Sequence, residues 1–428
     1  MLEEGLAPRG PRSSMTTPRP GWLRAAVVAM AVDTVGVLPV FLTGALAVQL
    51  RQDIGLSLDT LGLVFASYFV AAALLSAPLG HLSERTGPEW TLRIGLVIYI
   101  VAFLGIAAIV SSPGALSAFV ALSGFGTSLT RTASSVLVAR SVDAARQGLA
   151  FGLKHSSIPV GSILAGLSVP AIALTVGWRW AYVGAAALTF AVLLFVPKPG
   201  APYVAAGTGG RADMSLGLLI LAAGSFALGS SAAASLGAYT VSTAVAAGLQ
   251  EGTAGVLVAV GSVVGLTSRL VIGHWSDRRL GSQLDLVSWM LAFGGFGFFA
   301  LGISRGNVMW LTVPVAFATG WAWLGSYNLA MIRLNPVAPG AAVGITQTGA
   351  FIGAIIGPAS LGFLAERYSF TVAWTVAAVA SSLAAILIFV LRRFILREPA
   401  SRELRARARS AIAGQPSQAG QPSQEGAP

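Results

Sequence analysis

Cysteine is absent from this 428-residue sequence, lysine occurs only at Lys154 and Lys198, and histidine occurs three times. Without thiols the chain cannot form a disulfide, a thiolate metal site or a cysteine nucleophile. Neither lysine stands in the Gly-Lys-Ser/Thr order of a phosphate-binding loop, and no His-Glu-x-x-His metal motif is present. We therefore expect no metal, no cofactor and no enzymatic activity, with a membrane-embedded enzyme as the alternative from another functional class.

Charged residues are also scarce, at 10% of the chain, whereas 55% of residues are hydrophobic and the mean hydropathy is +0.77. A soluble domain has about 25% charged residues, so this composition favours a surface that faces lipid. Runs of about 20 apolar residues, enough to cross a bilayer, recur along the chain. We predict an all-α integral membrane protein with twelve transmembrane helices, near residues 24–49, 58–80, 92–111, 115–139, 148–170, 178–196, 214–239, 253–273, 284–303, 308–332, 341–364 and 370–391.

The net charge of +11 raises the question of a nucleic-acid partner, but the positions of the basic residues exclude one. With the N-terminus in the cytoplasm, all but five of the 27 lysines and arginines lie in cytoplasmic tails, cytoplasmic loops or the adjoining helix ends. The exceptions are Arg51, Arg179, Arg305 and Arg367 in outside loops and Arg131 within a helix. This asymmetry follows the positive-inside rule, so we expect a multi-pass protein of the cell membrane with both termini in the cytoplasm.

The chain contains an internal repeat, which decides its architecture. The hexapeptide GHLSER that begins at Gly80 reappears as GHWSDR at Gly273, 193 residues later, and Arg140 and Arg333 have the same spacing. Small residues match at a spacing of 192, namely Gly148, Ala150, Gly152 and Gly161 with Gly340, Ala342, Gly344 and Gly353. We predict two pseudo-symmetric bundles of six helices each. The predicted divisions are a disordered N-tail (1–21, with Met1 or Met15 as the start), an N-terminal bundle (22–196), a cytoplasmic linker (197–213), a C-terminal bundle (214–391) and a C-tail (392–428).

The two hexapeptides extend to GHLSERTG and GHWSDRRLG, which resemble the Gly-x-x-x-Asp-Arg-x-Gly signature of the major facilitator superfamily. The first copy has Glu84 in place of aspartate, and the glycine of the second comes one residue late. The resemblance covers roughly residues 22–395 and implies a secondary transporter that works by alternating access, with its site near the midplane between the two halves.

The resemblance also implies a gating role for the motif residues Gly80, Glu84, Arg85, Gly87, Gly273, Asp277 and Arg278. Glu84 would meet the N-terminus of the predicted helix 341–364 near Ala341, and Asp277 would meet that of the predicted helix 148–170 near Gly148. Helix N-termini attract negative charge, so such contacts would hold the cytoplasmic side shut. The alternative is two ordinary solvated acidic turns.

Charges within the hydrocarbon are expensive and mark functional sites. Asp33 in helix 1 and Arg131 in helix 4 lie at similar depths, and neither has a charged counterpart in the second half. We expect Asp33 to accept a proton and Arg131 to be its counter-charge or to anchor an anionic solute; a purely structural ion pair is the alternative. Lys154 and His155 lie at comparable depth in the predicted helix 148–170, although Lys154 can also extend to the membrane surface.

The second half offers a neutral set of polar and aromatic side chains that could shape a substrate pocket: Tyr239, Trp321, Trp323, Tyr327, Asn328 and Gln347. Packing between helices is the alternative role for each of them. Pro39 and Pro159 lie near the middle of the predicted helices 24–49 and 148–170, where a proline leaves a backbone carbonyl unpaired and permits bending.

The sequence favours a proton-coupled symporter of a small organic anion, with the solute and protons as partners and a monomer as the working form. A drug–proton antiporter is the alternative. Exporters of that kind resemble one another in a Gly-Pro-x-x-Gly-Gly stretch, which residues 158–163 lack. A passive channel or facilitator also stays open. The C-tail from Arg392 has seven arginines, then repeats GQPSQ, which predicts a basic segment on anionic inner-leaflet lipid followed by disorder.

Overall fold

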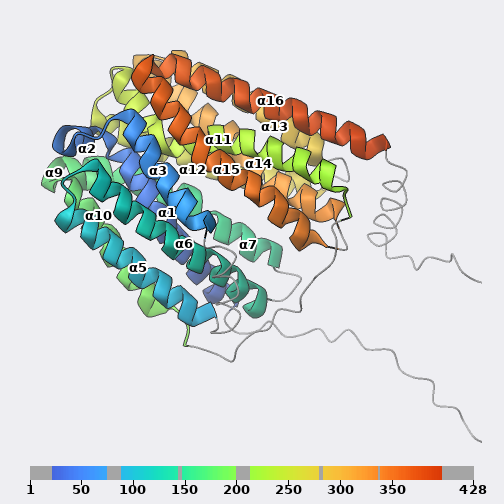
Figure 1. Ribbon diagram of the computed structural model, residues 1–428, viewed down its shortest axis with the longest axis horizontal. Helices are drawn as coiled ribbons and strands as arrows, with labels where there is room; N and C mark the ends of the chain where they lie inside the picture. Colours follow the sequence, from blue (N-terminus) through green and yellow to red (C-terminus); the bar gives the residue numbers. More distant parts are fainter. Residues whose placement is uncertain are drawn as a thin grey trace, which may run out of the picture.

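The computed structural model of the chain describes residues 22–74, 88–142, 147–198, 213–278, 283–335 and 338–397. Within these ranges the regular secondary structure is entirely helical, and Figure 1 shows long helices running side by side. Helices suit a chain this apolar because each pairs its own backbone N–H and C=O groups, for which lipid offers no partner. The predicted all-α fold is therefore confirmed.

Residues before the segment 199–212 form the first group of helices. These are α1 (Trp22–Ala45), α2 (Ala47–Ile54), α3 (Leu58–Leu74), α5 (Pro88–Ile109), α6 (Pro113–Ser141), α7 (Gln147–His155), α8 (Ser157–Ser168), the π-helix η2 (Val169–Ala173), α9 (Leu174–Val176) and α10 (Trp178–Phe195). The second group comprises α11 (Leu216–Ala246), α12 (Glu251–Arg278), α13 (Gln283–Ile303), the 3₁₀ turn η3 (Gly306–Val308), α14 (Met309–Leu334), α15 (Pro339–Arg367) and α16 (Phe370–Arg397). Each predicted helix has a counterpart in this series.

Ten helices of the described chain are long and apolar enough to cross a membrane, and the pair α2 and α3 makes an eleventh if it is counted as one bent span. That pair bends by 111° where Gly55 has a φ of +70°, a conformation that glycine adopts readily. The remaining candidate is α6, which is 29 residues long but rich in serine and threonine. Polar side chains suit α6 to line an internal site rather than to face lipid.

The predicted helix 148–170 is interrupted in the structure. Helix α7 ends at His155, and α8 begins at Ser157. In an α-helix the carbonyl of His155 would accept the N–H of residue 159, but Pro159 has no N–H to donate. The break therefore lies where the proline leaves the backbone unpaired, as the sequence predicted.

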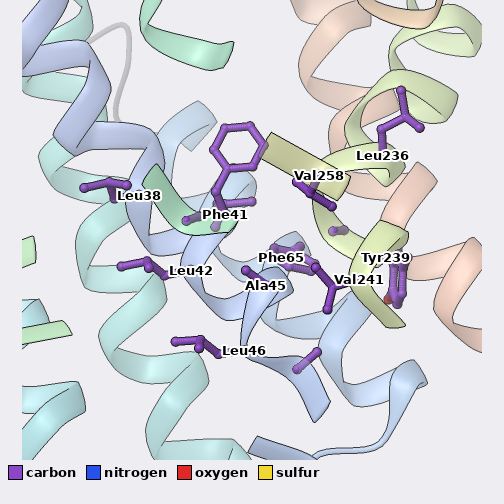
Figure 2. Packing of buried hydrophobic residues seen from close by; sticks show 14 of the residues in the cluster. Leu38, Phe41, Leu42, Ala45, Leu46, Phe65, Leu236, Tyr239, Val241 and Val258 are labelled. Atoms are coloured by element: carbon purple, nitrogen blue, oxygen red, sulfur yellow. The ribbon is translucent and has the colours of Figure 1, made fainter. Parts of the chain in front are cut away.

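The two groups of helices pack closely at the side where α1 ends and α3 begins, which we call the loop side; the tail side is where α1 begins and α16 ends. A Cβ added at Gly62 of α3 would lie 2.6 Å from the Pro358 carbonyl oxygen of α15, so glycine permits this contact. Figure 2 shows Phe41 and Phe65 of the first group beside Tyr239 and other apolar side chains of the second. The Phe65 and Tyr239 rings meet edge to face, with their centroids 6.3 Å apart.

Candidate functional site

Asp33 of α1 and Lys154 of α7 form a buried ion pair. The Lys154 Nζ atom lies 3.2 Å from Asp33 Oδ2, and the two side chains are 3% and 12% exposed. The Ser134 hydroxyl donates to Asp33 Oδ1 at 2.8 Å, and Lys154 Nζ also donates to the Ser135 hydroxyl at 2.8 Å. Both charges thus have hydrogen-bond partners on α6, which a buried ion pair needs to be tolerated.

Arg131 is predicted to be either the counter-charge of Asp33 or the anchor of an anionic solute. The structure places Lys154 in the first of these roles. The Arg131 side chain is exposed, and its guanidinium carbon lies 5.7 Å from the centroid of the Phe351 ring on α15. The short helix α7 explains the exchange, because it packs against both α1 and α6 and turns Lys154 inward between them. Lys154 therefore does not extend to the membrane surface in this structure.

A buried hydrogen-bond network fixes α1 one turn beyond Asp33. The Tyr68 hydroxyl donates to the Gly36 carbonyl at 2.6 Å and lies 2.8 Å from the Thr127 hydroxyl. The Tyr99 hydroxyl lies 2.9 Å from Thr127 and 2.8 Å from Thr130. These contacts join α1, α3, α5 and α6, so they hold the backbone that presents Asp33. No local sequence pattern indicates this network, because it links residues far apart in the chain.

Arg269 of α12 is a further charged residue beside the site. It lies near the end of the predicted helix 253–273, and the structure places it in the apolar span Glu251–Ile272 of α12. Its Nη1 and Nη2 atoms donate to the carbonyl oxygens of His155 and Trp321, each at 3.0 Å. His155 thus contributes its backbone carbonyl to the site. The signal that could have found Arg269 is a basic residue several positions inside an apolar run.

Two of the predicted pocket residues meet as an amide pair. The Gln347 Nε2 atom of α15 donates to Asn328 Oδ1 of α14 at 3.4 Å, and both side chains are partly exposed. Phe351 follows Gln347 by four residues, so the two lie on one face of α15. This face carries the aromatic ring that Arg131 contacts from the other half of the chain.

The four aromatic residues predicted to line the pocket are packed between helices instead, each at most 4% exposed. Their polar atoms donate to backbone carbonyls: Tyr239 to Leu58 and Pro358, Trp321 to Ala233, Trp323 to Gly320 and Tyr327 to Ala222. Buried Tyr and Trp need such partners. These residues offer no surface to a solute here, which corrects the prediction in favour of its alternative.

The gating residues implied by the family resemblance lie in two segments. Gly80, Glu84, Arg85 and Gly87 lie outside the described residues. Gly273, Asp277 and Arg278 belong to the last turns of α12, but their side chains are outside the described part of the structure. The contacts expected near Ala341 and Gly148 therefore stay predictions.

Among the described residues, the site has an excess of positive charge. Asp33 is the one acid there beside three basic residues, namely Lys154, Arg131 and Arg269. Lys154 compensates Asp33, and Arg269 is occupied by two carbonyl oxygens. The Arg131 guanidinium is the exposed cation of the group. Because charge within a membrane is costly unless it is compensated, this arrangement suits the binding of an anion.

Comparisons with known proteins agree with this architecture. The family model of the Major Facilitator Superfamily matches residues 25–332 and 214–421. The chain is 30% identical over 145 residues to the uncharacterized MFS-type transporter Rv1250 of Mycobacterium tuberculosis, and 27% identical over 193 residues to the multidrug efflux protein YfmO of Bacillus subtilis. These alignments cover 33% and 43% of this chain but only 25% and 46% of the two relatives.

Solved structures share the fold. A bacterial homolog of the human lysosomal transporter Spinster, in an inward-facing and occupied conformation, matches with a TM-score of 0.67 over 94% of this chain and 100% of that one. The inward-facing and unoccupied form of such a homolog matches with a TM-score of 0.63 over the same shares. Identity is 12% in both cases, so these matches concern the fold alone.

Proposed function

This chain belongs to the Major Facilitator Superfamily. We propose that it is a membrane transporter of small-molecule solutes, namely a proton-coupled symporter of a small organic anion. The observation that carries the proposal is the buried Asp33–Lys154 pair beside the exposed guanidinium of Arg131. One group can take up a proton, and the other can take up a negative charge.

Competition for the cations would couple the two ligands. An anionic solute that reaches Arg131 also attracts Lys154, which lies against the Arg131 backbone, with Nζ 3.5 Å from its carbonyl oxygen. If Lys154 turns to the solute, the Asp33 carboxylate is left without its counter-charge in a site of low polarity and is neutralised by a proton. Solute binding thereby favours proton binding, and the reverse follows by linkage.

The solute would bind between the two halves. Arg131 supplies the charge from α6, while Phe351 and the Asn328–Gln347 amide pair supply an apolar face and hydrogen bonds from α15 and α14. A ligand held by groups from both halves binds best when they stand at one particular separation. Such a preference is what alternating access requires.

The test uses purified protein and a panel of small carboxylates and phosphate esters. A thermal-shift screen selects the compound that stabilises the protein, and proteoliposomes then report its accumulation after a pH jump. Asp33→Asn is expected to retain exchange of labelled solute while losing pH-driven accumulation. The matched control is Asp53→Asn, which removes an acid paired with Arg179 at 2.9 Å on the loop side. Normal pH-driven accumulation by Asp33→Asn would refute the role of Asp33.

A drug–proton antiporter is the second candidate, favoured by the likeness to the multidrug efflux protein YfmO. A cationic drug would then displace the proton from Asp33 and would need no contact with Arg131. Arg131→Gln separates the two functions, because we expect it to raise the KM of an anion about tenfold or more. An unchanged KM, together with stabilisation of the protein by organic cations, favours the antiporter. A passive facilitator is favoured instead if a protonophore leaves transport intact.

We also propose the cell membrane as the location, with both termini in the cytoplasm and the chain acting as a monomer. The positive-inside distribution of lysine and arginine supports this orientation. On that orientation the loop side faces outward, and its close packing would belong to a state that is closed to the outside. The arginines of the C-tail would then lie against anionic lipid of the inner leaflet.

A further inference from the structure

Arg269 joins the two halves of the molecule through backbone atoms. It belongs to α12 of the second half, and its Nη1 atom donates to the carbonyl of His155 in the first half at 3.0 Å. Its Nη2 atom donates at the same distance to the carbonyl of Trp321 on α14, within its own half. One planar guanidinium thereby links a carbonyl from each half.

The His155 carbonyl is available because of Pro159. A helix would pair this oxygen with the N–H of residue 159, and proline has none. An unpaired carbonyl in a membrane-spanning segment is costly, so it needs a donor from elsewhere. Arg269 provides that donor from the opposite half, which makes the contact depend on how the halves are placed.

The same turn of α7 holds the charged pair. Lys154, which binds Asp33, directly precedes His155, whose carbonyl binds Arg269. In the part of the chain that the structure describes, the charged and titratable groups around this turn are Asp33, Lys154, Arg131, the His155 ring and Arg269. The phenols of Tyr68 and Tyr99 lie beside Gly36 of α1. A displacement of Lys154 along with its backbone would therefore also displace the His155 carbonyl.

We propose that Arg269 is the positioning residue that connects the Asp33–Lys154 pair to the contact between the two halves. While the pair is formed, the His155 carbonyl stays within reach of Arg269, and the arrangement closed at the loop side is stabilised. When the pair separates, the last turn of α7 moves, the contact with Arg269 is lost, and the halves can rearrange. The contact itself stands independently, whereas its link to the pair rests on the function proposed above.

Distances between spin labels test the contact without solute or proton gradient, because the chain has no cysteine of its own. One cysteine pair at Trp90 and Leu216 reports the tail side, and another at Ile109 and Leu311 reports the loop side; all four side chains are exposed. Arg269→Gln is expected to lower the ratio of loop-side-closed to loop-side-open molecules about tenfold. Arg269→Lys should have a smaller effect, since one ammonium lacks the fork that reaches two carbonyls.

Pro159→Ala is the decisive companion variant. It restores an N–H that can pair with the His155 carbonyl inside the helix, so it should shift the distances in the same direction as Arg269→Gln. The double variant should then shift them no further than either change alone. The matched control is Arg305→Gln, because Arg305 donates to the carbonyls of Gly302 and Ser304 within the second half.

Three outcomes would overturn the proposal. Unchanged distances in Arg269→Gln, with an unfolding temperature equal to that of the control, would refute the contact. Additive shifts from Pro159→Ala and Arg269→Gln would refute its pairing with the His155 carbonyl. If Asp33→Asn leaves the distances unchanged while Arg269→Gln alters them, the link to the charged pair is refuted. None of these outcomes depends on a transport measurement, so they are distinct from a failure of the proposed function.

Discussion

At the scale of single residues, the identity of the partner of Asp33 determines what the site can do. A carboxylate paired with a lysine has a counter-charge on a flexible stem, which can swing to an anionic solute. The pair is formed by residues from α1 and α7, and hydroxyls of α6 complete it. Arg131 is exposed and has no ion pair with any acid that the structure describes, which is the feature that supports an anion as solute.

Removal of Lys154 should reveal how strongly the pair is coupled. Lys154→Met leaves Asp33 without its counter-charge in a buried site, and breaking such a pair costs about 3–5 kcal/mol. We expect a marked fall in the unfolding temperature of the detergent-solubilised protein. The double variant Asp33→Asn, Lys154→Met should regain most of that loss and still lack pH-driven accumulation.

Lys198→Met is the control for this experiment, because Lys198 is the other lysine of the chain and follows α10 outside the membrane-spanning helices. Its unfolding temperature should equal that of the parent protein. A Lys154→Met protein as stable as this control would contradict the buried ion pair.

At the scale of helices, the breaks matter as much as the long spans. The interruption between α7 and α8 leaves the His155 carbonyl to accept a hydrogen bond from Arg269 of another helix. The bend between α2 and α3 brings the N-terminus of α3 to the end of α15. There the Glu366 carboxylate accepts the Leu58 N–H at 3.0 Å and lies 3.1 Å from Arg51. An acid from the second half thus caps a helix of the first half.

We expect Glu366→Gln to loosen the closed loop side. The variant loses the ion pair with Arg51 and the charge at the α3 N-terminus, which together contribute about 1 kcal/mol at this partly exposed position. The measurement is the labelling rate of a cysteine introduced at Phe65, a buried residue of the interface, which should rise several-fold. Asp285→Asn, which breaks a pair with Arg392 inside the second half, should leave the rate unchanged. Equal rates in the two variants would rule out a closing role for Glu366.

At the scale of the whole molecule, two groups of helices pack across an interface made by α1, α3 and α8 on one side and α11, α12 and α15 on the other. Small residues and edge-to-face rings allow this packing on the loop side, while Arg131 and Arg269 of the charged site each contact the opposite group. This placement is what a transporter needs, because rotation of one group against the other then changes access to the site.

The orientation of the whole chain is open to a direct test. Reporter fusions at the N-terminus, in segment 199–212 and at the C-terminus should all report the cytoplasm, since lysine and arginine concentrate on that side. Fusions at Arg51 and Arg305 should report the outside. A C-terminus found outside would contradict the even number of membrane crossings on which the two-bundle prediction rests.

The sequence by itself determined the helical membrane fold, the positions of the helices and the family, because hydropathy, charge asymmetry and the repeated motif are local properties of the chain. It also identified Asp33 and Arg131 as charges within helices, and Pro159 as the point where the predicted helix 148–170 loses a backbone hydrogen bond. Only the tertiary structure decided which charges meet. Whether Lys154 reaches the membrane surface or Asp33 depends on how α7 is rotated against α1 and α6, and whether Arg269 finds a carbonyl depends on the distance between the two halves. Neither quantity is encoded in the spacing of residues along one helix, because each is set by packing between helices that are remote in the sequence.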